Sequence, residues 1–295
     1  MRLIAKIGTL MTALLLVNAT GNIAIAAGGA DYIKDTKRVD WSFGGIFGGY
    51  DKAQLQRGFQ VFKEVCTSCH SADYLAFRNL VQEGGPEFPE AQIKALAREY
   101  DITDGPNVEG DMFDRPGILS DYWPAPYDNA AQAAALNNGA APPDLSLIAK
   151  ARSAYFKRPN AFISDLYLMS RDVVTQYQEG GADYIYSLLA GYGHDIPPEA
   201  HPENHQSSYF NPYYAGGNGW IAMAPPLSDG LVEYSDGSPE TVDQYAKDVS
   251  AFLMWLAEPH LEARKQSGLI VISFLIIFAG LLYASKKKVW ADIAH

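Results

Sequence analysis

Cysteine is scarce in this chain, since Cys66 and Cys69 are its only two cysteines in 295 residues. So few cysteines exclude a disulfide-rich scaffold, and a bridge across two intervening residues is uncommon. No second C-x-x-C pair follows, so a structural zinc site would lack half of its ligands. A thioredoxin-like redox pair would not require the histidine that follows at position 70, and would favour a βαβ setting.

Positive charge is also in short supply. The chain carries 34 acidic and 23 basic residues, a formal net charge of −11. Two of the basic residues lie at the N-terminal end and three in the C-terminal tail, so the part between them is more acidic still. Such a domain should repel nucleic acid and anionic membrane surfaces, and should attract basic partners in a salt-dependent way.

The N-terminal residues have the pattern of a secretory signal peptide. Two basic residues precede an apolar run, Ile7 to Val17, which is too short to span a bilayer, and Ala24-Ile25-Ala26 is a typical cleavage site. We therefore expect residues 1–26 to be removed and the mature chain to begin near Ala27. The alternative, an N-terminal membrane helix, is disfavoured by the polar residues that interrupt the apolar run.

Near the C-terminus the pattern is that of a membrane anchor. Gly268 to Ser285 contains no charged residue and is long enough to cross a bilayer as a helix. We expect a transmembrane helix over residues 267–285, a periplasmic domain over 27–266 and a cytoplasmic tail over 286–295, which begins with three lysines. A buried core helix is disfavoured by the terminal position and by the lysine cluster.

The stretch Cys66-Thr67-Ser68-Cys69-His70 reads C-x-x-C-H, the attachment signature of a c-type haem. Its two thiols can add to the two vinyl groups of one haem, and His70 can then ligate the iron. A cleaved export signal would put these residues in the compartment where such attachment occurs. With both cysteines bound to haem no disulfide remains, so the domain must be stabilised by its core and by the haem itself.

The sixth iron ligand decides what such a haem can do. A methionine sulfur closes the position and raises the potential, which suits electron transfer, whereas an open position suits ligand binding or catalysis. The candidates outside the signal peptide are Met112, Met169, Met223, Met254, His194, His201 and His205. Met223 is favoured because it lies in an apolar, proline-stiffened loop, Trp220 to Leu227. Met169 and Met254 lie in helical apolar stripes that favour packing, and the histidines lie in a polar loop.

Apolar periodicity predicts a mainly helical domain. One helix is expected from its cap at Asp51, with Leu55, Phe59, Phe62 and Val65 on one face, so that both cysteines fall on its final turn. Further helices are expected at 91–100, through Ala149, within 159–178, at 183–190 and from Ser238-Pro239-Glu240 to Pro259. Irregular segments are expected at 27–50, 83–128 and 197–218. The acidic residues of 83–128 are either a solvated surface or a docking patch.

Several motifs together resemble the cytochrome c1 family, the haem subunit of the cytochrome bc1 complex, in its alphaproteobacterial or mitochondrial form. The resemblance covers most of the mature chain. It is carried by Cys66 to His70, Asn137 to Ala140 with Pro142 to Ser146, Asp183-Tyr184 with Ser187 to Leu189, Tyr209 to Tyr213, Ile221 to Leu227 and the last apolar helix. The chain departs from the mitochondrial pattern by an insert at about 153–181 and by the lack of an extra cysteine pair.

The resemblance implies a class I-like cytochrome c domain with long loops and insertions. It also implies one covalent haem c. The residues that it assigns to the haem are Cys66 and Cys69 as attachment sites, His70 and Met223 as axial ligands, Arg152 as partner of a propionate, and Tyr184 and Pro143 in the pocket.

The function implied by the resemblance is single-electron transfer from the Rieske iron–sulfur protein to a cytochrome c, with no catalytic site beyond the redox haem. Cytochrome b and the iron–sulfur protein would be its partners in a dimeric complex, and a basic cytochrome c its acceptor. Two alternatives remain. One is an anchored haem subunit of a terminal oxidase, and the other is a haem enzyme or gas sensor with an open iron site.

Overall fold

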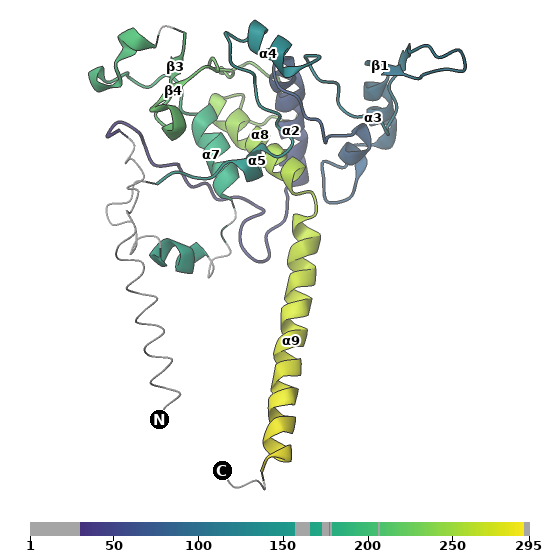
Figure 1. The fold of residues 1–295 in the computed structure, drawn as a ribbon, viewed down its shortest axis with the longest axis vertical. Helices are drawn as coiled ribbons and strands as arrows, with labels where there is room; N and C mark the ends of the chain where they lie inside the picture. Colours follow the sequence, from purple (N-terminus) through teal and green to yellow (C-terminus); the bar gives the residue numbers. More distant parts are fainter. Residues whose placement is uncertain (1–29, 157–165, 173–176, 178, 206, 292–295) are drawn as a thin grey trace.

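The computed structural model describes residues 30–156, 166–172, 177, 179–205 and 207–291. In these residues a mainly helical domain stands at one end of a single long helix (Figure 1). The expected signal peptide and the last four residues of the tail lie outside the described residues.

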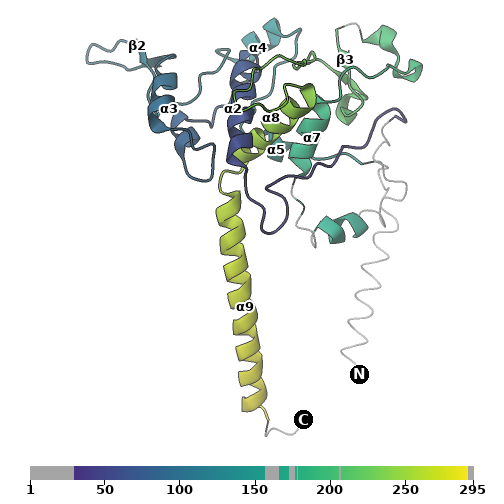
Figure 2. The ribbon, with the colours of Figure 1, turned by 180° about the vertical axis from the view of Figure 1, so that it is seen from behind.

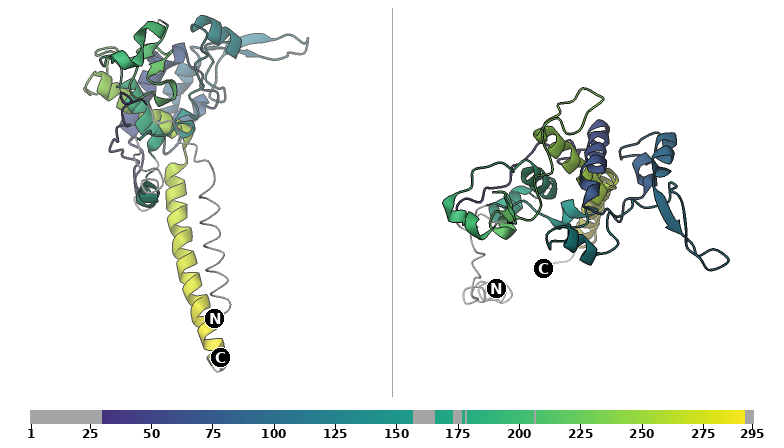
Figure 3. Two further views of the ribbon diagram at one scale, coloured as in Figure 1. Left: turned by 60° about the vertical axis from the view of Figure 1, so that its left-hand side comes forward. Right: turned by 90° about the horizontal axis from the view of Figure 1, so that it is seen from above.

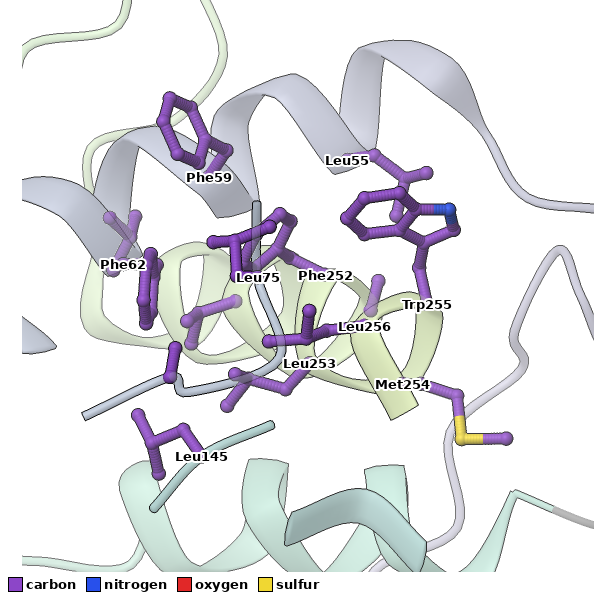
Figure 4. Packing of buried hydrophobic residues seen from close by; sticks show 14 of the residues in the cluster. Leu55, Phe59, Phe62, Leu75, Leu145, Phe252, Leu253, Met254, Trp255 and Leu256 are labelled. Carbon is purple, nitrogen blue, oxygen red and sulfur yellow. The ribbon is translucent and has the colours of Figure 1, made fainter. Parts of the chain in front are cut away.

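Two crossed helices, α2 (Lys52–Glu64) and α8 (Val242–Ala257), form the centre of the core. The predicted cap is confirmed, because the Asp51 side chain accepts a hydrogen bond from the Gln54 amide at 2.8 Å. Their apolar faces meet through aromatic rings, with Phe62 and Phe252 centroids 5.3 Å apart (Figure 4). The crossing requires glycine at Gly58, since a Cβ there would lie 2.1 Å from the Asp248 carbonyl oxygen.

The start of α8 differs from the sequence prediction. Ser238, Pro239 and Glu240 were expected to begin the helix, but α8 begins at Val242 after Thr241, whose side chain accepts from the Gln244 amide at 3.3 Å. Glu240 instead serves the preceding loop, because its carboxylate accepts from the Tyr234 amide and its carbonyl accepts from Gly230.

A second pair of helices, α5 (Ile148–Ala151) and α7 (Gly180–Leu189), packs against α8. The N-terminal segment from residue 30 to 50 has no helix or strand and wraps this layer, as expected. It is tied there by Asp183 of α7, which accepts from the Val39 amide at 3.0 Å and from the Trp41 indole at 2.8 Å. Asp183 is fully buried.

Several short elements were not predicted. They are a hairpin of β1 (Asp101–Asp104) and β2 (Phe113–Pro116), a small antiparallel pair of β3 (Tyr209–Phe210) and β4 (Trp220–Ile221), the helix α4 (Ala130–Leu136), and 3-10 turns at Cys66–Ser68, Phe77–Val81, Pro198–Ala200, Pro202–Asn204 and Ala215–Gly217. The hairpin follows α3 (Glu90–Ala97) and extends away from the body (Figure 3). Its strands are too short and too polar to show an apolar alternation.

The insert contains a helical stretch at residues 166–172, within the helix expected over 159–178. Phe162 and Val173 lie outside the described residues. Leu166 and Met169 are 63% and 66% exposed, so the expectation that this apolar stripe packs against the domain is wrong for these two residues.

The last helix, α9 (Leu261–Val289), begins after the break at Pro259, as predicted. Leu261 is buried, and the apolar side chains that follow are exposed, so the helix stands clear of the domain (Figure 2). It is long and apolar enough to cross a membrane. Its first turns are joined to the domain, because Lys265 donates to the Phe43 carbonyl at 2.6 Å and Arg264 to Glu258 at 2.5 Å.

Candidate haem site

The two cysteines lie on a tight turn directly after α2. Sequence reasoning placed them on the last α-helical turn, but the chain tightens into a 3-10 turn at Cys66–Ser68. The Cys66 carbonyl accepts from both the Cys69 amide at 3.2 Å and the His70 amide at 2.9 Å. One carbonyl thus fixes the relative positions of all three residues of the motif, and both thiols are free and partly buried.

Burial raises the pKa of the Cys66 thiol to about 12, and the neighbouring Cys69 adds to the rise. A redox-active or metal-binding pair needs a lowered pKa, because the thiolate is the reactive form. The environment of Cys66 is therefore unlike that of a thioredoxin-type pair. It suits a sulfur that ends as a thioether.

The His70 ring is held by a single carbonyl. Its Nδ1 lies 2.8 Å from the Pro143 carbonyl oxygen, which can only accept, so Nδ1 carries the hydrogen and Nε2 is left with a free lone pair. Burial lowers the pKa of His70, although this hydrogen bond and the charge of Asp144 act in the opposite direction. The ring is therefore neutral at neutral pH with Nε2 available, which is the form that binds iron.

The segment that bears Pro143 is fixed by the next residue, Asp144. Its carboxylate accepts from the Ser71 hydroxyl, the Asp73 amide and the Ser146 amide, each at 2.8 Å. Burial raises the pKa of Asp144, but these hydrogen bonds outweigh it and the pKa is lowered. Asp144 was not predicted as a site residue, although an Asp side chain that accepts from the backbone amide two residues on is a known turn pattern.

Met223 lies in the loop that leaves β4. Its side chain is partly buried, and its carbonyl accepts a hydrogen bond from the Tyr192 hydroxyl at 2.9 Å. Pro225 and Pro226 follow, and Leu227 then packs against the same core cluster as Cys66. The loop of Met223 and the cysteine turn therefore border one continuous core.

Tyr184 and Arg152 belong to the same region. Burial raises the pKa of Tyr184, Tyr214 raises it further and the Arg152 guanidinium lowers it, so the three side chains lie within electrostatic reach. Burial also raises the pKa of Tyr192, with a contribution from Tyr184. In the described part of the chain no carboxylate lies within ion-pair distance of the exposed Arg152, which leaves this cation available for an external anion.

The other candidates for the sixth ligand are engaged or placed elsewhere. Met254 is fully buried and its side chain points away from its labelled neighbours in the core (Figure 4). His205 stacks on Trp220 with ring centroids 4.5 Å apart. Three more are exposed or bound to other groups: Met112 and Met169, each at least 60% exposed, and His201, paired with Glu203. His194 lies against Tyr213, and burial and Lys34 lower its pKa.

The arrangement fits a c-type haem. It offers two sulfurs on one turn, an imidazole whose free nitrogen is set by a carbonyl, a thioether on a constrained loop and a guanidinium that has no carboxylate partner among the described residues. Sequence reasoning found each of these residues but missed Asp144 and Tyr192. Their contacts bridge 71 and 31 residues of sequence, a separation that no local pattern reveals.

Comparisons with known proteins place the chain in one family. A model described as the Cytochrome C1 family matches residues 41–293. The chain is 55% identical to the cytochrome b/c1 of Bradyrhizobium diazoefficiens, over 85% of this chain and 35% of that protein. It is 47% identical to the cytochrome c1 of Blastochloris viridis over 86% of each chain, and 43% identical to that of Rhodospirillum rubrum over 92% of this chain and 95% of the relative. It therefore spans about a third of the first relative and most of the other two.

Proposed function

The chain belongs to the cytochrome c1 family, and on that premise we propose that it passes single electrons from a Rieske iron–sulfur protein to a cytochrome c within a cytochrome bc1 complex. Its function is electron transfer, its cofactor is a c-type haem, and it is anchored to a membrane. The observation that carries the proposal is the C-x-x-C-H turn with the His70 ring oriented by the Pro143 carbonyl.

The proposed assignment gives each site residue one role. Cys66 and Cys69 would hold one haem through thioether bonds, and His70 Nε2 and Met223 Sδ would supply the ligands to its iron. Arg152 pairs with a propionate. When bound, the haem iron supplies a one-electron step between its ferric and ferrous states. Because the chain would hold both iron ligands, little rearrangement would accompany this step, and no side chain would have to move a proton.

We place the haem domain, residues 27–266, on the periplasmic side of the inner membrane, with the transmembrane helix over 267–285. The three lysines from Lys286 to Lys288 favour a cytoplasmic tail over 286–295, and the N-terminal signal pattern over 1–26 favours export of the domain. The chain would carry out this function only as one subunit of a complex.

The proposed partners are cytochrome b and the iron–sulfur protein, in a dimeric complex. The name of the Bradyrhizobium relative, cytochrome b/c1, supports a close association of cytochrome b with a chain of this family. The acidic balance of the domain supports a basic cytochrome c as acceptor, attracted electrostatically at low ionic strength.

Purification of the tagged full-length chain from its native membrane in a mild detergent tests this function. The proposal expects cytochrome b and an iron–sulfur protein in the preparation, and quinol-dependent reduction of a basic cytochrome c whose rate falls as salt is added. Copper-containing subunits in place of cytochrome b would instead establish the terminal-oxidase alternative.

A further inference from the structure

The loop that carries Met223 is held by very few polar contacts. Pro225 and Pro226 have no amide hydrogen to donate, and β4 ends at Ile221. Within the residues that the structure describes, the stretch 222–227 has one recorded hydrogen bond. It joins the Tyr192 hydroxyl to the Met223 carbonyl oxygen at 2.9 Å. The backbone of the candidate ligand is thus fixed at one atom by one side chain.

The backbone at Tyr192 is itself constrained, because it follows α7 after only Ala190 and Gly191. A Cβ at the preceding Gly191 would lie 2.5 Å from the Tyr213 ring and 2.6 Å from the Ser187 carbonyl oxygen, so the chain passes through a space that only glycine fits. Tyr192 therefore extends from a backbone with little freedom to move. Its hydroxyl is a fixed point relative to α7.

A second contact ties the same helix end to the start of the ligand loop. The fully buried Asn211 donates its side-chain amide to the Leu188 carbonyl at 2.7 Å. Its backbone amide donates to the Gly219 carbonyl at 2.7 Å, just before β4. The end of α7 thus contacts the 209–223 segment near both ends, through Asn211 before β4 and through Tyr192 after it.

We propose that Tyr192 is a positioning residue for the sixth iron ligand: by donating to the Met223 carbonyl, it keeps the thioether sulfur directed at the iron in both oxidation states. This inference rests on the proposed function, because it takes Met223 as the ligand. A thioether is a soft ligand that suits ferrous better than ferric iron, so the ligand needs support from its loop when the iron is oxidised.

The size of the effect follows from the net value of one hydrogen bond. Its loss should shift the balance between bound and displaced Met223 about three- to tenfold toward the displaced state. A displaced methionine leaves the iron open. The expected signature is therefore an increase of that size in carbon monoxide binding by the ferrous protein, with weakening of the charge-transfer band that marks methionine bound to ferric iron.

The experiment compares four full-length, membrane-anchored proteins in detergent: wild type, Tyr192→Phe, Tyr186→Phe and Met223→Leu. Tyr186 is the matched control, because it lies on α7, the helix that precedes Tyr192, and its hydroxyl donates at 2.6 Å to Asp243 of α8, away from the ligand loop. Each preparation is checked for haem content and thermal unfolding before the spectra and carbon monoxide titrations are recorded. Tyr192→His, which keeps a ring donor, is added as a partial rescue.

The inference expects Tyr192→Phe to bind carbon monoxide three- to tenfold more than wild type, Tyr192→His to fall between them, and Tyr186→Phe to match wild type. It is overturned if Tyr192→Phe behaves as wild type while Met223→Leu binds freely, or if both tyrosine variants loosen the iron site equally. If Met223→Leu itself binds carbon monoxide no better than wild type, Met223 is not the ligand, and the assignment made under the proposed function fails as well. Because Met223→Leu tests the ligand and Tyr192→Phe tests its support, the two failures can be told apart.

Discussion

Arg152 is the residue whose role can be separated most cleanly from folding. It is exposed, and among the described residues its side chain makes one long hydrogen bond, 3.4 Å, with the neighbouring Ala151 carbonyl. If it pairs with a propionate, its cation favours the ferrous state, because the oxidised haem carries one more positive charge. Arg152→Gln should lower the midpoint potential by up to about 40 mV, the one-electron equivalent of an exposed ion pair of about 1 kcal/mol.

The control for this prediction is Arg98→Gln, the same change on the exposed end of α3. Spectroscopic redox titration at two ionic strengths is the measurement. Arg152→Gln alone should shift, and by more at low salt. An equal shift in both variants would show that only overall charge matters.

Asp144 should govern how well His70 is held. Its carboxylate accepts three hydrogen bonds, two from amides and one from a hydroxyl. Asn at this position offers one acceptor oxygen and turns an amide donor toward another donor. Asp144→Asn should therefore destabilise the holoprotein by about 1–3 kcal/mol in denaturant unfolding, and should reduce haem incorporation. Asp73→Asn, on an exposed carboxylate in the segment that Asp144 binds, should leave both nearly unchanged.

The candidate site residues differ in whether the neighbouring sequence indicates their role. Cys66, Cys69 and His70 could be predicted because a fixed spacing encodes their chemistry, and Met223 because prolines follow it. Asp144 and Tyr192 could not, since each acts on a backbone group of a distant segment. The sequence prediction of 83–128 as irregular likewise left Arg115 without a role, although it donates to Asp104 and Asp121.

Among the elements, the β1–β2 hairpin depends on that arginine. Arg115 reaches the Asp121 carboxylate with two nitrogens at 2.7 and 2.9 Å, and this pairing lowers the pKa of Asp121 despite an opposing effect of burial. A carboxylate with a lowered pKa stabilises the fold above its ordinary pKa, near 4, and loses that contribution as the pH falls through the lowered value.

Arg115→Gln should therefore speed amide hydrogen exchange at Ile102 and Phe113, which lie in the hydrogen-bonded pairs of the hairpin, at neutral pH, and the difference from wild type should vanish in strong acid. Lys94→Gln is the control, since it removes an exposed ion pair with Glu90 on α3. If Arg115→Gln does not change the amide hydrogen exchange of the hairpin at neutral pH, this account of how the hairpin is stabilised is contradicted.

Helices with a regular apolar stripe were predicted and strands were not. α2, α7 and α8 each have a buried face that repeats with helical period, so their existence was predictable. The start of α8 was misplaced because Glu240 bonds back to the loop, a tertiary contact that overrides a good local capping pattern. The four-residue strands of the hairpin carry mostly polar side chains and give no periodic signal.

At the scale of the whole molecule, the junction between domain and membrane helix has a sharp boundary. Glu262 accepts from the Tyr50 amide at 2.6 Å and Lys265 donates to the Phe43 carbonyl at 2.6 Å, whereas the apolar side chains after Ser267 are exposed. A chain that ends after Ser267 should be released as a soluble haem protein that unfolds at nearly the temperature of the full chain.

A chain that ends after Pro259 is the matched comparison, because it lacks both anchoring contacts and the buried Leu261. It should melt about 5 °C lower, as expected for the loss of roughly 2 kcal/mol in a domain of this size. Thermal melts followed by haem absorbance compare the chain that ends after Ser267 with the chain that ends after Pro259. Equal melting temperatures would mean that α9 has no part in stabilising the domain.

The central claim is that one haem is held between His70 and Met223 in an electron-transfer protein. A spectroscopic redox titration of isolated membranes, wild type beside Met223→Leu, tests it most directly. Since axial ligands set haem potentials over a span of about 0.8 V, the wild type should titrate as one high-potential c-type haem and the variant should fall by well over about 100 mV. A variant that titrates like wild type would contradict the assignment of Met223, and with it the proposal of a closed, six-coordinate electron carrier.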